Sequence, residues 1–239
     1  MRVTFFTLLL FVVLGVSSTG PATAQSKNLA PGFSALPKGA KVAIMPTDIE
    51  LFSISGGGVL EPKADWTESA TKHFKAALLQ SKHWRGLTTL ELSEKDADEL
   101  AEINSLHAAV ARAISIHHFG TTQLRMPLLT KDGKLDWSMG EPVQAIKKIT
   151  GADYALFSWI RDSYTSSERA AAMVAMGILT LGRALPRGGS QIGYASLVDL
   201  NTGQVLWFNQ LARNSGDLRE VEPAAETLEA LLANFPAAP

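Results

Sequence analysis

Apolar and polar positions follow two patterns along the chain, short continuous apolar runs and longer stretches with helical spacing. The short runs predict strands, at 41–47, at 48–52 as an edge continuation of the first, at 86–92 and at 154–160. Apolar residues at three- and four-residue spacing predict amphipathic helices, over 65–81, 94–116, 141–150 and 222–235. Strands and helices therefore alternate through most of the chain.

The C-terminal half contains a predicted β-hairpin over 191–211. Two apolar runs flank the Asn-Thr-Gly sequence at 201–203, where Gly203 can take the positive φ that such a turn requires. Asp199 precedes the turn and is expected to accept hydrogen bonds from its amides. The order of elements predicts an α/β fold, a single layered domain over 41–239 with a mixed sheet, this hairpin and helices packed on the sheet.

Three residues carry signals for the ends of the predicted helices. Asp65, with Glu68 three residues later, forms a capping-box pattern. Ser93 precedes the second helix, and Gly151 follows the third at the position where helices commonly end on glycine. We therefore predict Asp65 and Ser93 as N-caps and Gly151 as the C-terminal stop.

The N-terminus has the pattern of a secretory signal peptide. A positive start is followed by a mostly apolar run of 12 residues at 5–16 and by small residues ending in Ala24. That run is short against the roughly 20 residues of a spanning helix, so cleavage after Ala24 is favoured over an uncleaved anchor. We predict a signal peptide over 1–24, a flexible segment over 25–40, and a periplasmic or secreted mature protein.

Composition narrows the function classes. Lys and Arg number 22 against 23 Asp and Glu, a balance that argues against a nucleic-acid binder acting through bulk charge. The chain has no cysteine, which excludes disulfides, thiolate metal sites, cysteine nucleophiles and lipid attachment to cysteine. We therefore expect a protein that is not a lipoprotein and that does not bind nucleic acid.

Candidate chemistry is sparse. The five histidines are spaced as helix-surface or helix-end residues rather than as converging metal ligands. The triglycine at 56–58 lacks the spacing of a phosphate-binding loop and is interpreted as a flexible loop. Asp48 and Glu50 at a strand end could line a pocket for a ligand or for hydrolysis. No catalytic residue, metal or cofactor is predicted, and the balance favours a protein that is not an enzyme.

An apolar insert at about 166–190 is the most unusual segment. It carries no charge from 170 to 182, which is too short for a spanning helix. Three interpretations stay open: a buried helix, a segment that contacts a partner or a membrane, and a hairpin of strands in an oligomeric pore. The candidate contact residues are Met173, Val174, Met176, Ile178, Leu179 and Leu181.

The strand KVAIMPTDIEL, the strand GADYALFSWI, the hairpin GYASLVDLNTGQVLWFNQL and a C-terminal helix together resemble the CsgG/LpoB-like group, related to the N-terminal domain of TolB. This resemblance implies an exported α/β domain of the bacterial envelope. The group includes the curli secretion channel and lipoprotein activators of cell-wall synthases. It implies no catalytic residue, and the missing cysteine departs from its lipoproteins.

These observations predict a non-enzymatic envelope protein that acts in assembly, scaffolding or regulation. Its expected partner is another envelope protein or a second copy, with peripheral membrane contact through the insert as a further option. One alternative is a periplasmic binding or hydrolytic protein with a pocket near Asp48 and Glu50. A further alternative is a subunit of an oligomeric secretion channel.

Overall fold

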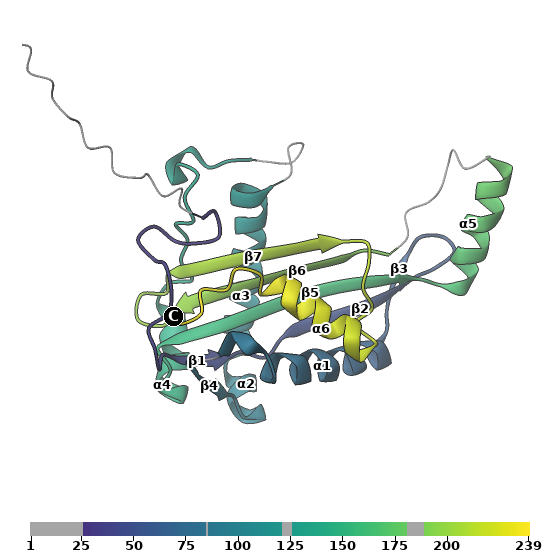
Figure 1. Cartoon of the computed structure of the whole chain (residues 1–239). Helices are drawn as coiled ribbons and strands as arrows, with labels where there is room; N and C mark the ends of the chain where they lie inside the picture. Colours follow the sequence, from purple (N-terminus) through teal and green to yellow (C-terminus); the bar gives the residue numbers. More distant parts are fainter. Residues whose placement is uncertain (1–25, 85, 121–125, 181–188) are drawn as a thin grey trace, which may run out of the picture.

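Seven strands form one mixed sheet with helices on both faces (Figure 1). The computed structural model describes residues 26–84, 86–120, 126–180 and 189–239, so the predicted signal peptide and Leu181 lie outside the described residues. The strands are β1 (Lys41–Ile44), β2 (Asp48–Ile54), β3 (Leu60–Pro62), β4 (Thr88–Glu91), β5 (Tyr154–Thr165), β6 (Gln191–Asp199) and β7 (Val205–Arg213). The α-helices are α1 (Ala64–Leu79), α2 (Glu94–Glu99), α3 (Ala101–Ile114), α4 (Gln144–Thr150), α5 (Ser167–Leu179) and α6 (Val221–Leu231). The predicted α/β class is confirmed.

The long strand β5 organises the sheet. One edge pairs antiparallel with β6 along Tyr154 to Asp162, and β6 pairs in turn with β7. The other edge is shared by two parallel strands, since β1 pairs with the first residues of β5 and β2 with Trp159 to Thr165. The segment after β1 therefore continues along the same edge of β5, as the sequence predicted. It is not wholly an edge, because β3 pairs with its last residues.

Two hydrophobic cores lie on opposite faces of this sheet. Helices α1 and α6 cover one face, where Phe74 and Leu228 pack against Trp207 and the inward residues of β1, β2 and β5. Helices α3 and α4 cover the other, where Ile114 packs around Phe157. Strands covered on both faces become continuous apolar runs, which explains the 154–160 run of β5.

The segment before β1 packs on the domain rather than leading into it loosely. Ala30 and Leu36 are fully buried, and the Ala30 amide donates to the Leu206 carbonyl at 2.8 Å. The Phe208 amide donates to the Asn28 carbonyl at 2.9 Å, so residues 28–30 lie along the outer edge of β7. The Pro- and Gly-rich composition predicted a flexible segment. The segment is irregular instead, and it packs on the domain through Ala30 and Leu36.

The cap predictions were partly correct. Ser93 caps α2 by accepting a hydrogen bond from the Asp96 amide at 3.2 Å, and Gly151 ends α4 with φ +68°. The prediction for Asp65 was wrong, because α1 begins one residue earlier with Lys63 at the N-cap and no side-chain cap. Asp65 lies in the first turn, where its negative charge favours the helix through the macrodipole.

The predicted hairpin is present as β6 and β7, with a tight turn at 201–203. Asp199 accepts hydrogen bonds from the Asn201 and Thr202 amides at 2.7 and 3.1 Å, as predicted. Gly203 has φ +74°, and a Cβ there would collide with the backbone of Gly140. The turn therefore requires glycine for two reasons, backbone conformation and space.

This geometry predicts a large difference between two glycine substitutions. Gly203→Ala should lower the free energy of unfolding by about 2–4 kcal/mol, because it adds a steric clash to an unfavourable φ. Gly151→Ala is the matched control, since it has φ +68° but open space around its Cβ, and should cost only about 1 kcal/mol. Urea unfolding followed by tryptophan fluorescence measures both. Equal losses would show that space at Gly203 does not matter.

Candidate functional site

Helix α5 stands at the end of β5, beyond both cores. The chain passes from β5 into α5 through Ser166, whose Oγ accepts a hydrogen bond from the Arg169 amide (3.2 Å) and caps the helix. The Ser166 amide donates to the Ile54 carbonyl at 3.1 Å, which fixes the start of the helix to β2. Figure 1 shows α5 projecting away from the sheet at this end. Its base is therefore anchored while its length extends from the domain.

The triglycine turn of the β2–β3 hairpin lies against the base of α5. A Cβ at Gly58 would lie 3.2 Å from Nη1 of Arg169, and a Cβ at Gly56 would lie 4.0 Å from the Cβ of Glu168. Gly58 also has φ +85°, which favours glycine. These glycines allow hairpin and helix to approach closely, a role that the sequence-based interpretation as a flexible loop did not include.

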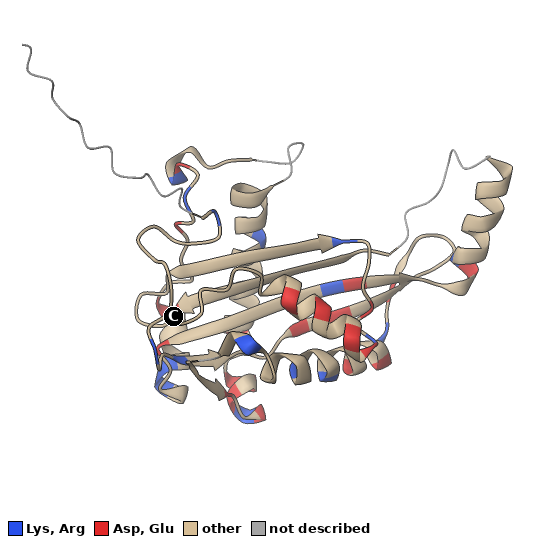
Figure 2. Cartoon of the chain, viewed as in Figure 1, with Lys and Arg blue, Asp and Glu red and all other residues tan. Residues whose placement is uncertain are grey.

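No residue of α5 is buried. Four of its large apolar side chains are exposed: Val174 (64%), Met176 (43%), Ile178 (72%) and Leu179 (80%). Met173 is half-buried. Figure 2 shows no charged residue on the helix beyond its base. Soluble proteins normally bury a helix that is apolar on most sides, so the exposed helix α5 is a candidate contact surface.

Two of the three interpretations of the insert do not describe 167–179. The segment is an α-helix there rather than strands, because its alanine and methionine content favours helix. It is also not a buried helix. The neighbouring hairpin adds the exposed residues Val59 (63%) and Leu60 (54%) to the same end of the molecule. Within the described ranges, no helix has the length and apolar character needed to cross a membrane.

A buried polar network lies where β5 leaves the cores. Asp162 is 3% exposed, and its carboxylate accepts hydrogen bonds from Oη of Tyr164 (2.6 Å), Nε2 of Gln191 (2.6 Å) and the Ser163 amide (2.8 Å). Burial raises the pKa of Asp162 above its ordinary value, although these hydrogen bonds act in the opposite direction. Oη of Tyr164 also accepts from the Leu218 amide at 2.8 Å, which links β5 to the segment before α6.

The network continues through Gln191 to the other strands. Oε1 of Gln191 accepts hydrogen bonds from Nε of Arg213 (2.8 Å) and Oγ1 of Thr227 (3.2 Å), and Arg213 also donates to Thr227. The ends of β5, β6, β7 and α6 are thereby joined. The three donors to the Asp162 carboxylate come from β5 and β6, and through Gln191 the network reaches β7 and α6. The arrangement fixes elements together at the foot of the α5 projection.

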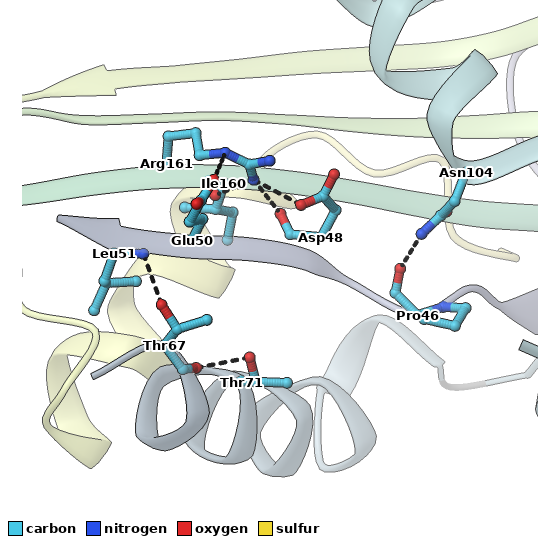
Figure 3. Close-up of polar contacts among 9 residues, drawn as sticks. All are labelled: Pro46, Asp48, Glu50, Leu51, Thr67, Thr71, Asn104, Ile160 and Arg161. Atoms are coloured by element: carbon cyan, nitrogen blue, oxygen red, sulfur yellow. Dashed lines mark hydrogen bonds and ion pairs between the residues drawn. The ribbon is translucent and has the colours of Figure 1, made fainter. Parts of the chain in front are cut away.

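Within the described residues, Asp48 and Glu50 pair with one cation, and neither lines the hollow described below. Both carboxylates contact the Arg161 guanidinium, Asp48 through Nη1 at 2.7 Å and Glu50 through Nε at 3.2 Å (Figure 3). The guanidinium also lies over the ring of Trp159, 4.5 Å from its centroid. One cation therefore pairs with both acids on the surface of the sheet, and the geometry gives them a structural role.

An apolar hollow of ≈ 210 Å³ lies near this strand end, between α1, α2 and the ends of β1 and β4. It is lined by residues 44–47, Leu78, Leu92 and Ala97 among others, and neither Asp48 nor Glu50 reaches it. At its rim Lys75 pairs with Glu91 at 3.3 Å. The hollow and the acid pair are thus separate features.

The surface interpretation of the histidines was wrong for two of them. His107 is 2% exposed, stacks on Phe157 at 4.7 Å between ring centroids, and shares a 2.8 Å hydrogen bond with Oγ of Ser196. His118 is also buried and bonds the Lys27 carbonyl at 2.8 Å. Helical spacing did not show which side of α3 faces the sheet at these positions. Among the described residues, no three histidine or acidic side chains gather in a way that could hold a metal ion.

Comparison with known proteins gives weak likenesses of fold. No family model and no curated protein matches the chain. A PelC dodecamer structure from Paraburkholderia phytofirmans is 13% identical with a TM-score of 0.36, covering 88% of this chain and 95% of that one. The LpoB C-terminal domain from Salmonella enterica is 13% identical with a TM-score of 0.31, covering 78% and 88%. Lipoprotein GNA1162 from Neisseria meningitidis is 12% identical with a TM-score of 0.32, covering 82% and 94%.

One of these proteins, LpoB, belongs to the group that the sequence resembles, and membership of that group stays a prediction. At these identities and TM-scores the likenesses assign no family, and the site is interpreted from its own geometry.

The Asp162 network predicts a cost for Tyr164→Phe. Removing the hydroxyl leaves the Leu218 amide and one Asp162 oxygen without this partner, so the free energy of unfolding should fall by about 1–3 kcal/mol. Tyr154→Phe is the matched control, because the Tyr154 hydroxyl makes no hydrogen bond among the described residues, and should change stability by less than about 0.5 kcal/mol. Urea unfolding at pH 7 compares them. Equal effects would mean that the network does not stabilise the fold.

The burial of His107 predicts a pH dependence of stability. Burial lowers the pKa of His107 from 6.5 to about 3. Between these two values the His107 side chain is protonated in the unfolded chain but neutral in the folded chain. This part of the stability is present above pH 6.5 and falls as the pH drops toward 3. Between pH 7 and pH 5 the wild type should lose about 2 kcal/mol more than His107→Gln, measured by urea unfolding. Parallel pH profiles of the two proteins would contradict the assignment.

Proposed function

We propose that this chain is a non-enzymatic, exported protein of the bacterial envelope, and that it acts in assembly, scaffolding or regulation by binding another envelope protein through α5. The exposed apolar surface of α5 is the single observation that carries the proposal. We define the α5 surface as Met173, Val174, Met176, Ile178 and Leu179, with Val59 and Leu60 beside its base. The sixth candidate contact residue, Leu181, lies outside the described residues. The signal-peptide pattern supports export.

The distribution of side chains favours a protein groove over a membrane surface. A helix lying on a membrane has one polar and one apolar face, whereas α5 has no charge between 170 and 180 on any side. Its 13 residues give a length of about 20 Å, well short of the roughly 30 Å hydrocarbon core. A groove that surrounds the helix would bury most of its circumference, and the methionines can adapt to such a surface.

The free energies of side-chain burial and of association indicate that the tip of the β2–β3 hairpin takes part in the proposed contact. Burying one large apolar side chain contributes about 1.5–3 kcal/mol, so the four exposed side chains of α5 supply at most about 6–12 kcal/mol. Association costs about 4–15 kcal/mol in lost freedom. Adding Val59 and Leu60 raises the gain to about 9–18 kcal/mol, which favours a contact that includes the hairpin tip.

The experiment combines Met176→Asp and Leu179→Asp in one variant. A photo-crosslinking residue at Ile178 in the exported protein should give a defined adduct with an envelope protein, and the double variant should reduce that adduct at least tenfold. Leu129→Asp is the matched control, because Leu129 is 91% exposed and lies on a different element, residues 129–131. It should leave the adduct unchanged.

Stability measurements separate contact from folding. Because the two substituted side chains are exposed, the double variant should unfold within about 1 kcal/mol of the wild type. Loss of the fold in that variant, or an adduct that survives in it, would contradict the proposal. An adduct between copies of this chain would assign α5 to self-association, and a ring by light scattering would favour the oligomeric channel alternative.

A further inference from the structure

The outer edge of β7 is paired along its first half, and within the described residues its second half has no backbone partner on that side. Its first half is covered, because residues 28–30 pair with it through the Ala30–Leu206 and Phe208–Asn28 hydrogen bonds described above. The covering segment then turns away, since the Ser26 carbonyl accepts from the Leu29 amide at 3.1 Å. Beyond this point β7 continues through Asn209 to Arg213 with β6 on its inner side only.

Strand geometry shows which backbone groups face the open edge. In an antiparallel pair, alternate residues direct both their N–H and C=O groups to the same side. The Phe208 amide points outward to Asn28, so Gln210 and Ala212 point outward as well. Neither residue has a backbone hydrogen bond on that side within the described chain. Among the described residues, the outward amides and carbonyls of Gln210 and Ala212 therefore have no backbone partner.

The exposed edge lacks the devices that usually prevent strand addition. Natural edges carry lysine, proline, bulges or inward charges, whereas the outward positions here are a glutamine and an alanine. The Gln210 side chain is held aside, because its Oε1 accepts a hydrogen bond from Oγ of Ser115 at 2.9 Å. Ala212 is exposed and adds no bulk.

An apolar hollow of ≈ 200 Å³ adjoins this edge on the α3 side. Its walls come from the end of α3 and from β6 and β7, with Ile116, Ile192 and Tyr194 among the lining residues. Ile116 is 37% and Ile192 is 38% exposed, so both can gain burial from an added side chain. The hollow lies on the face toward which Tyr194 and Ile192 point across from Gln210 and Ala212.

We propose that residues 210–212 of β7 bind an extended peptide segment of a partner protein, which adds antiparallel to the sheet. The peptide pairs its backbone with Gln210 and Ala212 and places an apolar side chain at an alternate position into the hollow. Residues 28–30 of the chain itself already pair antiparallel on the adjacent part of the same edge, which shows that a strand fits there. This site is independent of the α5 surface and lies on another side of the sheet.

The test uses a blocked pentapeptide of alternating threonine and valine (acetyl-Thr-Val-Thr-Val-Thr-amide) as the probe. Titration into isotope-labelled protein should shift the amide signals of Gln210 and Ala212 and slow their hydrogen exchange at least threefold. Ala212→Pro removes the outward N–H without removing a bond to β6, and should weaken binding about threefold to tenfold, the value of one hydrogen bond. Ala212→Val keeps the N–H and should bind like the wild type.

Three outcomes would overturn the proposal. First, the amide signals of Gln210 and Ala212 could remain unshifted up to the solubility limit of the peptide. Ala212→Pro and Ala212→Val, each shown to be folded by its amide spectrum, could bind the probe equally. Shifts at these two amides that depend on protein concentration without peptide would assign the edge to a second copy of the chain instead.

Discussion

Backbone pairing along β5 is the constraint on which the rest of the structure depends. Its first half is flanked by β1 and β6 and covered by helices on both faces, so it is largely apolar. Its second half continues between β2 and β6, and polar and charged residues become frequent from Arg161 onward. One strand therefore both holds the two cores together and carries α5 away from them.

The buried Asp162 network stabilises the transition between these two parts. Polar groups inside a protein lower stability unless each finds a partner. Here Asp162, Gln191 and Arg213 satisfy one another across three strands, and Thr227 adds α6. The network lies directly below the α5 projection. By joining β5, β6 and β7, it braces the strand from which α5 projects.

The α5 surface and the β7 edge offer different chemistry to partners. The first presents apolar side chains and no charge, so burial of apolar surface would drive the contact proposed above. The second presents unpaired backbone groups, so directional hydrogen bonds determine what can bind, and the adjoining hollow adds a small apolar contribution. The sequence indicated the first surface through its missing charges. It gave no sign of the second, because an open strand edge depends on which strands lie beside it.

The sequence by itself determined most of the elements of this protein. Continuous apolar runs and period-3.6 patterns identified strands and helices, and Gly203 and Asp199 identified the hairpin turn, because these signals act between residues near one another in the chain. The short strand β3 was not predicted, and the predicted helix over 94–116 is divided into α2 and α3. Only the tertiary structure decided that Arg161 pairs with both Asp48 and Glu50, that His107 is buried, and that α5 is exposed. Each of these depends on residues far apart in sequence, since burial and charge pairing are set by which elements the sheet brings together.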